Sequence, residues 1–326
     1  MELVVMDSPT DWMTARRIRC RERARGLAQN SRMIRSRLAR GSRMGFPFIQ
    51  PTLRGGRRSL RAFWPHNHKH PNFGDELGPL FAHAFLQRGV RWTSLTHCEV
   101  LLGGSTLELL MTPAYAARKH SGLRVWGAGF MFGNSRLNAQ ELGLDVVSVR
   151  GELSKERILG QVSDPGVGDL GLLASLFYEW PEPDPAKRYV LFVPHYMDEG
   201  SAFEDDIIDR WNDVKVARTS GSPYELMRKI AGAQMVVSSG LHPLIVADSF
   251  GVPNIWLKLS DRVGGGAFKF DDYLSVFNLE SRPMDPRIFF RQIDNEIGEY
   301  RRPGIGVVRQ EVLSSLSLAV SKASTD

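Results

Sequence analysis

The sequence predicts an α/β protein with two Rossmann-like domains whose sheets are mainly parallel and face a central cleft. From residue 63 to the C-terminus, short apolar segments alternate with segments of helical apolar spacing, a pattern typical of β-α-β units. A proline-rich segment at 180–185 divides this pattern into two series, because three alternating prolines fit neither a helix nor a sheet ladder. We therefore expect an N-terminal α/β domain at 63–180 and a C-terminal α/β domain, ending in helices, at 181–326.

The apolar spacing also predicts where individual elements lie. Ser222-Pro223-Tyr224-Glu225 begins a helix in the second series, because it combines a serine cap, a proline in the first turn and a glutamate three residues after the cap. For the first series we expect helices at 76–88, 107–119 and 153–159, and strands at 99–102, 124–126 and 146–149.

Residues 1–62 are predicted to be a separate, Arg-rich N-terminal extension. Residues 1–61 contain fifteen arginines, no lysine and four acidic residues, a formal charge of +11, whereas the rest of the chain carries −5. Anionic lipids attract arginine clusters, which predicts a peripheral contact with a membrane surface. Disordered chain, or sequence translated from upstream of the true start codon, is the alternative. Aromatic residues are not interleaved for base stacking, so we expect no nucleic-acid partner.

The composition excludes other classes. No apolar run approaches the ~18 residues of a membrane span, and the N-terminus lacks the apolar core of a signal peptide. Two cysteines, Cys20 and Cys98, are too few for a disulfide framework or a cysteine zinc site. We therefore expect a cytoplasmic protein, associated at most with the inner face of the membrane, that needs no metal and no cofactor.

The segment at 235–257 contains the strongest candidate site. A buried strand at 235–237 runs into a polar turn that includes Ser239, and a helix follows with His242 in its first turn. The first N–H groups of a helix have no partner within it and carry part of a positive charge, so they attract anions. A histidine there can act on an anion bound at the same point. His195 likewise follows a predicted strand, at 189–193.

Other residues also follow predicted strands. Gly103-Gly104-Ser105 and Gly127 either offer backbone N–H groups to an anion or are packing glycines. Arg150 suits bidentate capture of a carboxylate or phosphate, with an ion pair to Glu152 or Asp164 as the alternative. Ligands bind at the carboxyl ends of parallel strands, so we expect these residues to line one cleft.

Two further groups supply acid–base chemistry and charge. Asn72-Phe73-Gly74-Asp75 precedes the first predicted helix, either as a turn with a helix cap or as a site where Asp75 takes a proton from a sugar hydroxyl. Lys258, Arg262 and Lys269 follow the last strand around a run of three glycines. Such a loop could close over an anion, or be an ordinary solvated loop.

Seven short motifs, taken in order, resemble the polysaccharide pyruvyl transferase family. The resemblance covers about residues 64–275 and leaves out the Arg-rich extension. Many members have an arginine two residues before the histidine, where this chain has Gly240, although some exopolysaccharide-type members also lack it. The motifs are Asn72-Phe73-Gly74-Asp75, Leu101-Leu102-Gly103-Gly104, Trp126-Gly127-Ala128-Gly129, Val149-Arg150-Gly151-Glu152-Leu153-Ser154, Ser163-Asp164-Pro165, Ser239-Gly240-Leu241-His242 and Gly251-Val252-Pro253.

The resemblance implies a GT-B-like fold and a ketal-pyruvyltransferase of the exopolysaccharide type. Members transfer the enolpyruvyl group of phosphoenolpyruvate onto two hydroxyls of one sugar in a bacterial polysaccharide or its lipid-linked repeat unit, forming a ketal and releasing phosphate. The resemblance implies His242 as the acid, Asp75 as the base or hydroxyl-positioning group, and Arg150 as a catalytic anion-binding residue. The implied substrate-binding residues are Asn72, Gly74, Gly103, Gly104, Ser105, Gly127, His195, Ser239, Lys258 and Arg262.

Two other functions fit the same sequence. A GT-B-type glycosyltransferase would hold the diphosphate of a nucleotide sugar at the same helix N-terminus. A non-catalytic partner in a polysaccharide assembly complex would act through the Arg-rich extension, and the missing arginine at Gly240 favours this alternative. In an enzyme, we expect Arg150 with Lys258 or Arg262 to supply that charge.

Overall fold

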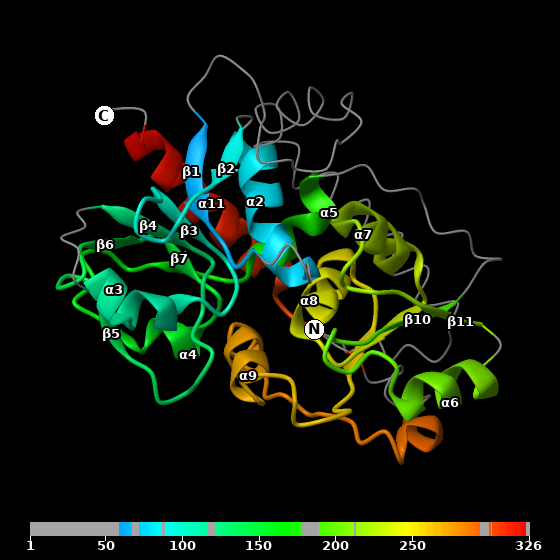
Figure 1. The fold of residues 1–326 in the computed structure, drawn as a ribbon. Helices are drawn as coiled ribbons and strands as arrows, with labels where there is room; N and C mark the ends of the chain where they lie inside the picture. Colours follow the sequence, from blue (N-terminus) through cyan, green and yellow to red (C-terminus); the bar gives the residue numbers. More distant parts are fainter. Residues whose placement is uncertain are drawn as a thin grey trace, which may run out of the picture. The chain divides into compact units, whose positions relative to one another are not determined.

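The computed structural model describes residues 59–66, 72–86, 89–116, 122–177, 189–211, 213–293, 300 and 302–323, all within one compact unit, Phe46–Asp326 (Figure 1). Most of the Arg-rich extension and the proline-rich segment at 180–185 lie outside the described residues. The domain boundaries expected from the sequence therefore stay predictions.

The first sheet has five strands in the order β2-β1-β3-β4-β6, and every pairing is parallel. Its central strand β3 is buried at all three positions, as expected for a parallel sheet covered on both faces. The same part of the chain forms two further two-stranded parallel sheets, β5 with β8 and β7 with β9. The strands are β1 (Leu60–Phe63), β2 (Val90–Trp92), β3 (Val100–Leu102), β4 (Leu123–Trp126), β5 (Leu137–Asn138), β6 (Leu144–Val146), β7 (Ser148–Val149), β8 (Ile158–Leu159) and β9 (Gly166–Val167).

The second sheet has four strands in the order β11-β10-β12-β13, again all parallel. They are β10 (Val190–Val193), β11 (Val214–Val216), β12 (Met235–Ser238) and β13 (Asn254–Trp256). Strands β10 and β12 are buried at every position, which explains why their sequences are continuous apolar runs. The α/β class and the mainly parallel sheets predicted from the sequence are thereby confirmed.

The helices alternate with the strands along the chain, as β-α-β units require, and the colours of Figure 1 follow this order. Ser222 caps α7 by accepting a hydrogen bond from the Glu225 N–H, as its sequence predicts. None of the helices in the described part of the chain has the length and apolarity needed to cross a bilayer. They are α2 (Phe73–Leu86), η1 (Leu107–Met111), α3 (Pro113–Ala116), α4 (Glu152–Lys155), η2 (Leu170–Leu173), α5 (Ala174–Phe177), α6 (Ala202–Arg210), α7 (Pro223–Gly232), α8 (Leu241–Phe250), α9 (Phe268–Ser275) and α11 (Ile305–Ala323).

The structure corrects two predicted helix boundaries. Helix α2 begins at Phe73, so Gly74 and Asp75 lie inside its first turn and not in a preceding loop. The single helix expected at 107–119 is instead the 3₁₀ helix η1 and the short α3, because Pro113 has no N–H with which to continue η1. The first correction matters for the site, since it places Asp75 on a rigid element.

Two further predictions near Arg150 also need correction. The helix expected at 153–159 ends at Lys155, and the chain continues into β8, whose Ile158 is buried in the core of the first sheet. The strand expected at 146–149 is divided, because β6 ends at Val146 and β7 pairs with β9 in a separate sheet. In both cases the burial of apolar side chains determines which element forms. The apolar spacing of so few residues does not show which side chains will be buried.

Contacts between helices join elements from the two series. Helix α2, which follows β1, packs against α8, which follows β12. The 3₁₀ helix η2 contacts both of them, and α9 packs against α4. These contacts place the helix carrying Asp75, the helix carrying His242 and the turn that contains Asp169 next to one another (Figure 1).

Candidate active site

His242 lies in the first turn of α8, directly after the turn that ends β12. Hydrogen bonds hold this turn to β10, since the Ser238 hydroxyl donates to the Val193 carbonyl and the His195 N–H donates to the Ser239 hydroxyl, at 2.9 Å. The Gly240 N–H also donates to the Ser238 hydroxyl. The hydroxyl of Ser239 thus has a structural partner in the backbone of His195.

Gly74 lies against the imidazole of His242. A Cβ atom at position 74 would come within 2.0 Å of Nδ1 and 2.5 Å of Cγ and Cε1, so only glycine lets α2 approach the ring this closely. The side chain of His242 is 16% exposed. Two motifs that are 168 positions apart in the chain, and that the sequence singles out separately, therefore meet at one point.

The surroundings of His242 keep its imidazole neutral. Burial lowers its pKa to about 3, with further contributions from Arg150, Lys269 and His195. Burial likewise lowers the pKa of His195 to about 4. At neutral pH both rings therefore lack a positive charge, and an anion bound nearby would raise the pKa of His242 by offsetting the nearby cations.

The carboxyl group of Asp75, on α2, has a raised pKa. Burial raises its pKa to about 7, while the Asn72 amide, which donates to Oδ2 at 3.2 Å, and the positive charge of Lys269 oppose that shift. A Cβ atom at Gly104, whose φ is +70°, would lie 3.7 Å from Oδ1, so the turn after β3 runs beside this carboxyl. A group with this pKa can both accept and release a proton near neutral pH.

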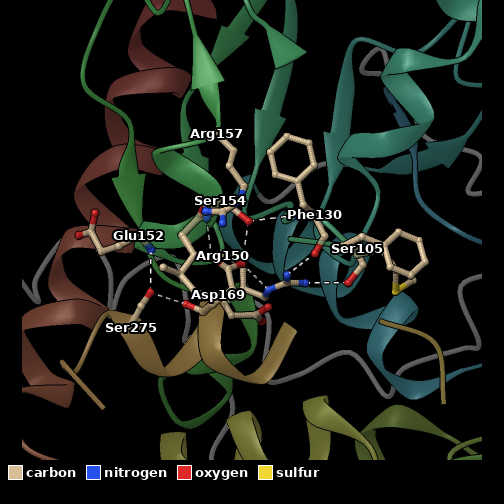
Figure 2. A network of polar contacts seen from close by, with 12 residues as sticks. Ser105, Phe130, Arg150, Glu152, Ser154, Arg157, Asp169 and Ser275 are labelled. Carbon is tan, nitrogen blue, oxygen red and sulfur yellow. Dashed lines mark hydrogen bonds and ion pairs between the residues drawn. The ribbon is translucent and has the colours of Figure 1, made fainter. Parts of the chain in front are cut away.

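Arg150 is fully buried at the end of β7 and donates in three directions (Figure 2). Its Nε donates to Asp272 at 2.8 Å, Nη1 to the Ser105 hydroxyl at 2.7 Å and Nη2 to the Phe130 carbonyl at 2.6 Å. The ion pair expected with Glu152 or Asp164 is not the one formed. Its partner is Asp272 of α9, which also accepts hydrogen bonds from the N–H and hydroxyl of Ser154.

Lys269 is a second buried cation and has different surroundings. Its residue is 8% exposed, and within the described residues its ammonium has neither a hydrogen bond nor an ion pair. The pKa of Lys269 is lowered to about 8, mainly by burial and also by the charge of Arg150. The charges of Asp75 and Asp198 oppose this shift. The ammonium therefore stands among the groups of the site without being neutralised by direct contact.

The two loop cations expected to bind the donor are exposed and have partners. Lys258 pairs with Asp261 at 2.8 Å and Arg262 with Asp198 at 3.7 Å. Their side chains are 52% and 59% exposed. Of the three cations, Lys269 is the buried one, and it lies in helix α9 and not in the loop.

The remaining glycine, Gly127, packs against the side chain of Leu170, where a Cβ atom would come within 2.7 Å. In the described part of the chain, no group of three or more His, Cys, Asp or Glu side chains is arranged to hold a metal ion. Sequence reasoning missed two buried carboxylates beside the site, Asp169 and Asp198. The glycine-rich segment 166–171, whose single acidic residue is Asp169, was the available signal for this residue.

Fold and site together define an α/β protein with a neutral histidine at a helix N-terminus and two buried cations, an arrangement suited to a small anionic substrate. The family model described as polysaccharide pyruvyl transferase matches residues 6–261, so the chain belongs to the polysaccharide pyruvyl transferase family. The match includes most of the Arg-rich extension, which the order of motifs alone leaves out.

Two curated proteins are similar to parts of the chain. The succinoglycan biosynthesis protein ExoV of Rhizobium meliloti (strain 1021) is 27% identical over 219 residues, which cover 66% of this chain and 64% of ExoV. The uncharacterized protein L143 of Acanthamoeba polyphaga mimivirus is 30% identical over 123 residues, or 36% of this chain and 42% of L143. The matches therefore span less than two thirds of either relative. No solved structure matches the chain.

Proposed function

We propose that this protein transfers the enolpyruvyl group of phosphoenolpyruvate onto two hydroxyls of one sugar in a polysaccharide or its lipid-linked repeat unit. The observation that carries the proposal is the proximity of three groups contributed by His242, Lys269 and Asp75: a neutral, largely buried imidazole, an ammonium without a hydrogen bond or ion pair in the described residues, and a carboxyl group with a pKa about 7. Membership of the family supports the transferase class, and the similarity to ExoV, a succinoglycan biosynthesis protein, supports a polysaccharide acceptor.

The donor carries a carboxylate and a phosphate, and the site offers charge for both. Lys269 and the N-terminus of α8 are available to a bound anion, whereas the guanidinium of Arg150 is held by three protein acceptors. We assign Lys269 as the direct anion-binding cation and Arg150 as the residue that holds α9, and with it Lys269, in place. Lys269 thereby supplies the positive charge that many family members carry on an arginine at the position of Gly240.

His242 then acts as the acid. The negative charge of the bound donor raises the pKa of the imidazole, so a proton is taken up as the donor binds. His242 gives that proton to the methylene carbon of phosphoenolpyruvate, which becomes a methyl group, and the adjacent carbon becomes an oxocarbenium centre. One sugar hydroxyl attacks this centre as Asp75 removes its proton.

Release of phosphate completes the ketal. The bond between the central carbon and the phosphate oxygen breaks, the second hydroxyl of the same sugar attacks, and its proton is lost. Of the two hydroxyl protons, one replaces the proton given to carbon and the other leaves with hydrogen phosphate, so atoms and charge balance. The reaction needs no oxidant, reductant or further cofactor, and we expect none.

The experiment is a phosphate-release assay with phosphoenolpyruvate and an extract of lipid-linked oligosaccharides. The wild-type protein should release phosphate and convert the acceptor to its pyruvate ketal. His242→Gln should lose about 10²-fold or more in turnover while still binding the donor. The matched control is His97→Gln, which replaces an exposed histidine that hydrogen-bonds only its neighbours in the described structure.

The same protein distinguishes the alternatives. Thermal stabilisation by UDP- or GDP-sugars, with none by phosphoenolpyruvate, would contradict the proposal in favour of a glycosyltransferase. Absence of phosphate release from a folded protein with its acceptor present would favour the non-catalytic partner. Turnover that persists after deletion of residues 1–58 would show that catalysis resides in the described unit.

A further inference from the structure

A buried carboxylate that the reaction above does not use faces His242. Asp169 is 3% exposed and forms the N-cap of η2, where its Oδ1 accepts a hydrogen bond from the Gly171 N–H at 2.7 Å. Its other oxygen, Oδ2, is buried and has no hydrogen-bond partner within the described residues. That oxygen lies 3.9 Å from Nε2 of His242.

An unpaired carboxylate oxygen in this position is unfavourable by itself. Removing a carboxylate from water without a hydrogen-bond donor costs several kcal/mol in general. Burial raises the pKa of Asp169 to about 6, so the group is still largely ionised at pH 7 and above. The distance to Nε2 is longer than a hydrogen bond, but one bridging water or a small rotation of the imidazole would close it.

The other charges around His242 explain what this carboxylate does. Arg150 of β7, Lys269 of α9 and His195 after β10 all lower the pKa of the imidazole, and α2 presents the backbone of Gly74 and, one residue on, the carboxyl of Asp75. Asp169 is the one carboxylate within 4 Å of its ring nitrogens in the described structure. It is therefore positioned to stabilise the imidazolium form.

We propose that Asp169 is a positioning residue that accepts the Nε2 proton of His242, fixes the ring in its Nε2–H tautomer and leaves Nδ1 to carry the proton that reaches the donor. Nδ1 forms no hydrogen bond within the described residues, and the backbone of Gly74 packs against the ring at this atom. After Nδ1 has given up its proton, the ring returns to the neutral Nε2–H form still bonded to Asp169. The inference rests on the proposed role of His242 as the acid.

The test uses Asp169→Asn, which keeps the cap acceptor and the shape but turns an amide NH₂ group toward Nε2. We expect turnover to fall about 10²-fold, with the KM for phosphoenolpyruvate changed less than about threefold, a ground-state binding change below 1 kcal/mol. The limb of the pH profile on which turnover falls with rising pH should move to lower pH by about one unit, because the imidazolium loses its carboxylate partner.

A second measurement does not depend on activity. In protein labelled with ¹⁵N-histidine, the signal of His242, assigned through His242→Gln, should report the Nε2–H tautomer in the wild type and a shift toward Nδ1–H in Asp169→Asn. The matched control is Asp248→Asn, which removes another buried carboxylate on α8, bonded to Tyr273 and Arg302, and should leave the tautomer unchanged.

The two readouts separate the two claims. A folded Asp169→Asn protein with an unchanged tautomer and an unchanged pH profile would overturn the role of Asp169. If the tautomer shifts in Asp169→Asn but the wild type shows no turnover of phosphoenolpyruvate, the proposed function is overturned while the contact between Asp169 and His242 stands.

Discussion

Two buried cations lie near the site, and their surroundings differ. Arg150 makes an ion pair with Asp272 and two further hydrogen bonds. Lys269 has neither an ion pair nor a hydrogen bond within the described residues, and its ammonium lies 5.5 Å from the centroid of the Phe270 ring. Removing one partner of a buried ion pair leaves the other charge uncompensated and destabilises the structure, whereas a charge without a paired partner is available to a ligand. In the function that we propose, the two cations have different roles: Arg150 holds α9 in place, and Lys269 on that same helix binds the donor.

The largest expected effect in this comparison is on stability. Arg150→Met leaves Asp272 buried without its cation, so the free energy of unfolding should fall by about 3–5 kcal/mol. The measurement is urea unfolding of the full chain. The double variant Arg150→Met with Asp272→Leu should recover part of the loss, since it leaves no unpaired charge at this position. Equal stability of Arg150→Met and the wild type would contradict the structural role of Arg150.

The next effect is on activity. Lys269→Met should lower kcat/KM for phosphoenolpyruvate by about 10²- to 10³-fold, because a desolvated cation on a transferring group is worth several kcal/mol. The same variant should unfold at higher urea concentration than the wild type at pH 7, since burying an unpaired ammonium is unfavourable. Lys258→Met, which removes an exposed cation of the same loop, is the control and should change kcat/KM little.

The comparison also predicts a pH dependence. Asp75 has a pKa about 7, so its ionised fraction increases as pH rises through 7. Turnover should rise with it, because the ionised form removes the proton of the attacking sugar hydroxyl. Lys269 lowers the pKa of Asp75, so Lys269→Met should move this limb to higher pH. Asp75→Asn should abolish this rising limb and leave low turnover that shows only the falling limb assigned to His242. A limb that persists in Asp75→Asn belongs to another group.

The smallest effect concerns Ser105, which the motif pattern assigns to substrate binding. Its hydroxyl accepts a hydrogen bond from Arg150 at 2.7 Å. Ser105→Ala should therefore cost about 1–2 kcal/mol of stability and leave the KM for phosphoenolpyruvate nearly unchanged. A large rise in KM at unchanged stability would indicate that Ser105 binds the donor directly. It would contradict the assignment of a structural role to Arg150 and a donor-binding role to Lys269.

The sequence predicts the parts of the site that depend on short-range patterns. The strand, turn and helix around His242 follow from a buried apolar run and a polar turn, and Gly74 with Asp75 follows from a motif beside a helix. The same patterns predict the parallel sheets. The expected membrane contact of the Arg-rich extension, the cytoplasmic location and the individual substrate-binding roles stay predictions.

The sequence does not reveal contacts that depend on tertiary packing. The partner of Arg150 is 122 positions away, and Asp164, the acid of the expected Ser163-Asp164-Pro165 motif, is 83% exposed and pairs with Lys155. Asp169, five residues further on, is the buried acid that faces His242. Which of three nearby cations is buried likewise depends on how α9 packs against α4, and composition carries no information about that contact.

The most direct test is the proton balance of donor binding, measured by titration calorimetry at pH 7 in buffers of different ionisation enthalpy. A neutral imidazole that becomes charged beside a bound anion should make the wild type take up about one proton more per phosphoenolpyruvate than His242→Gln, in which only other groups such as Asp75 can gain a proton. Equal proton uptake in the two proteins, or binding of phosphoenolpyruvate without any uptake, would contradict the assignment of His242 as the acid.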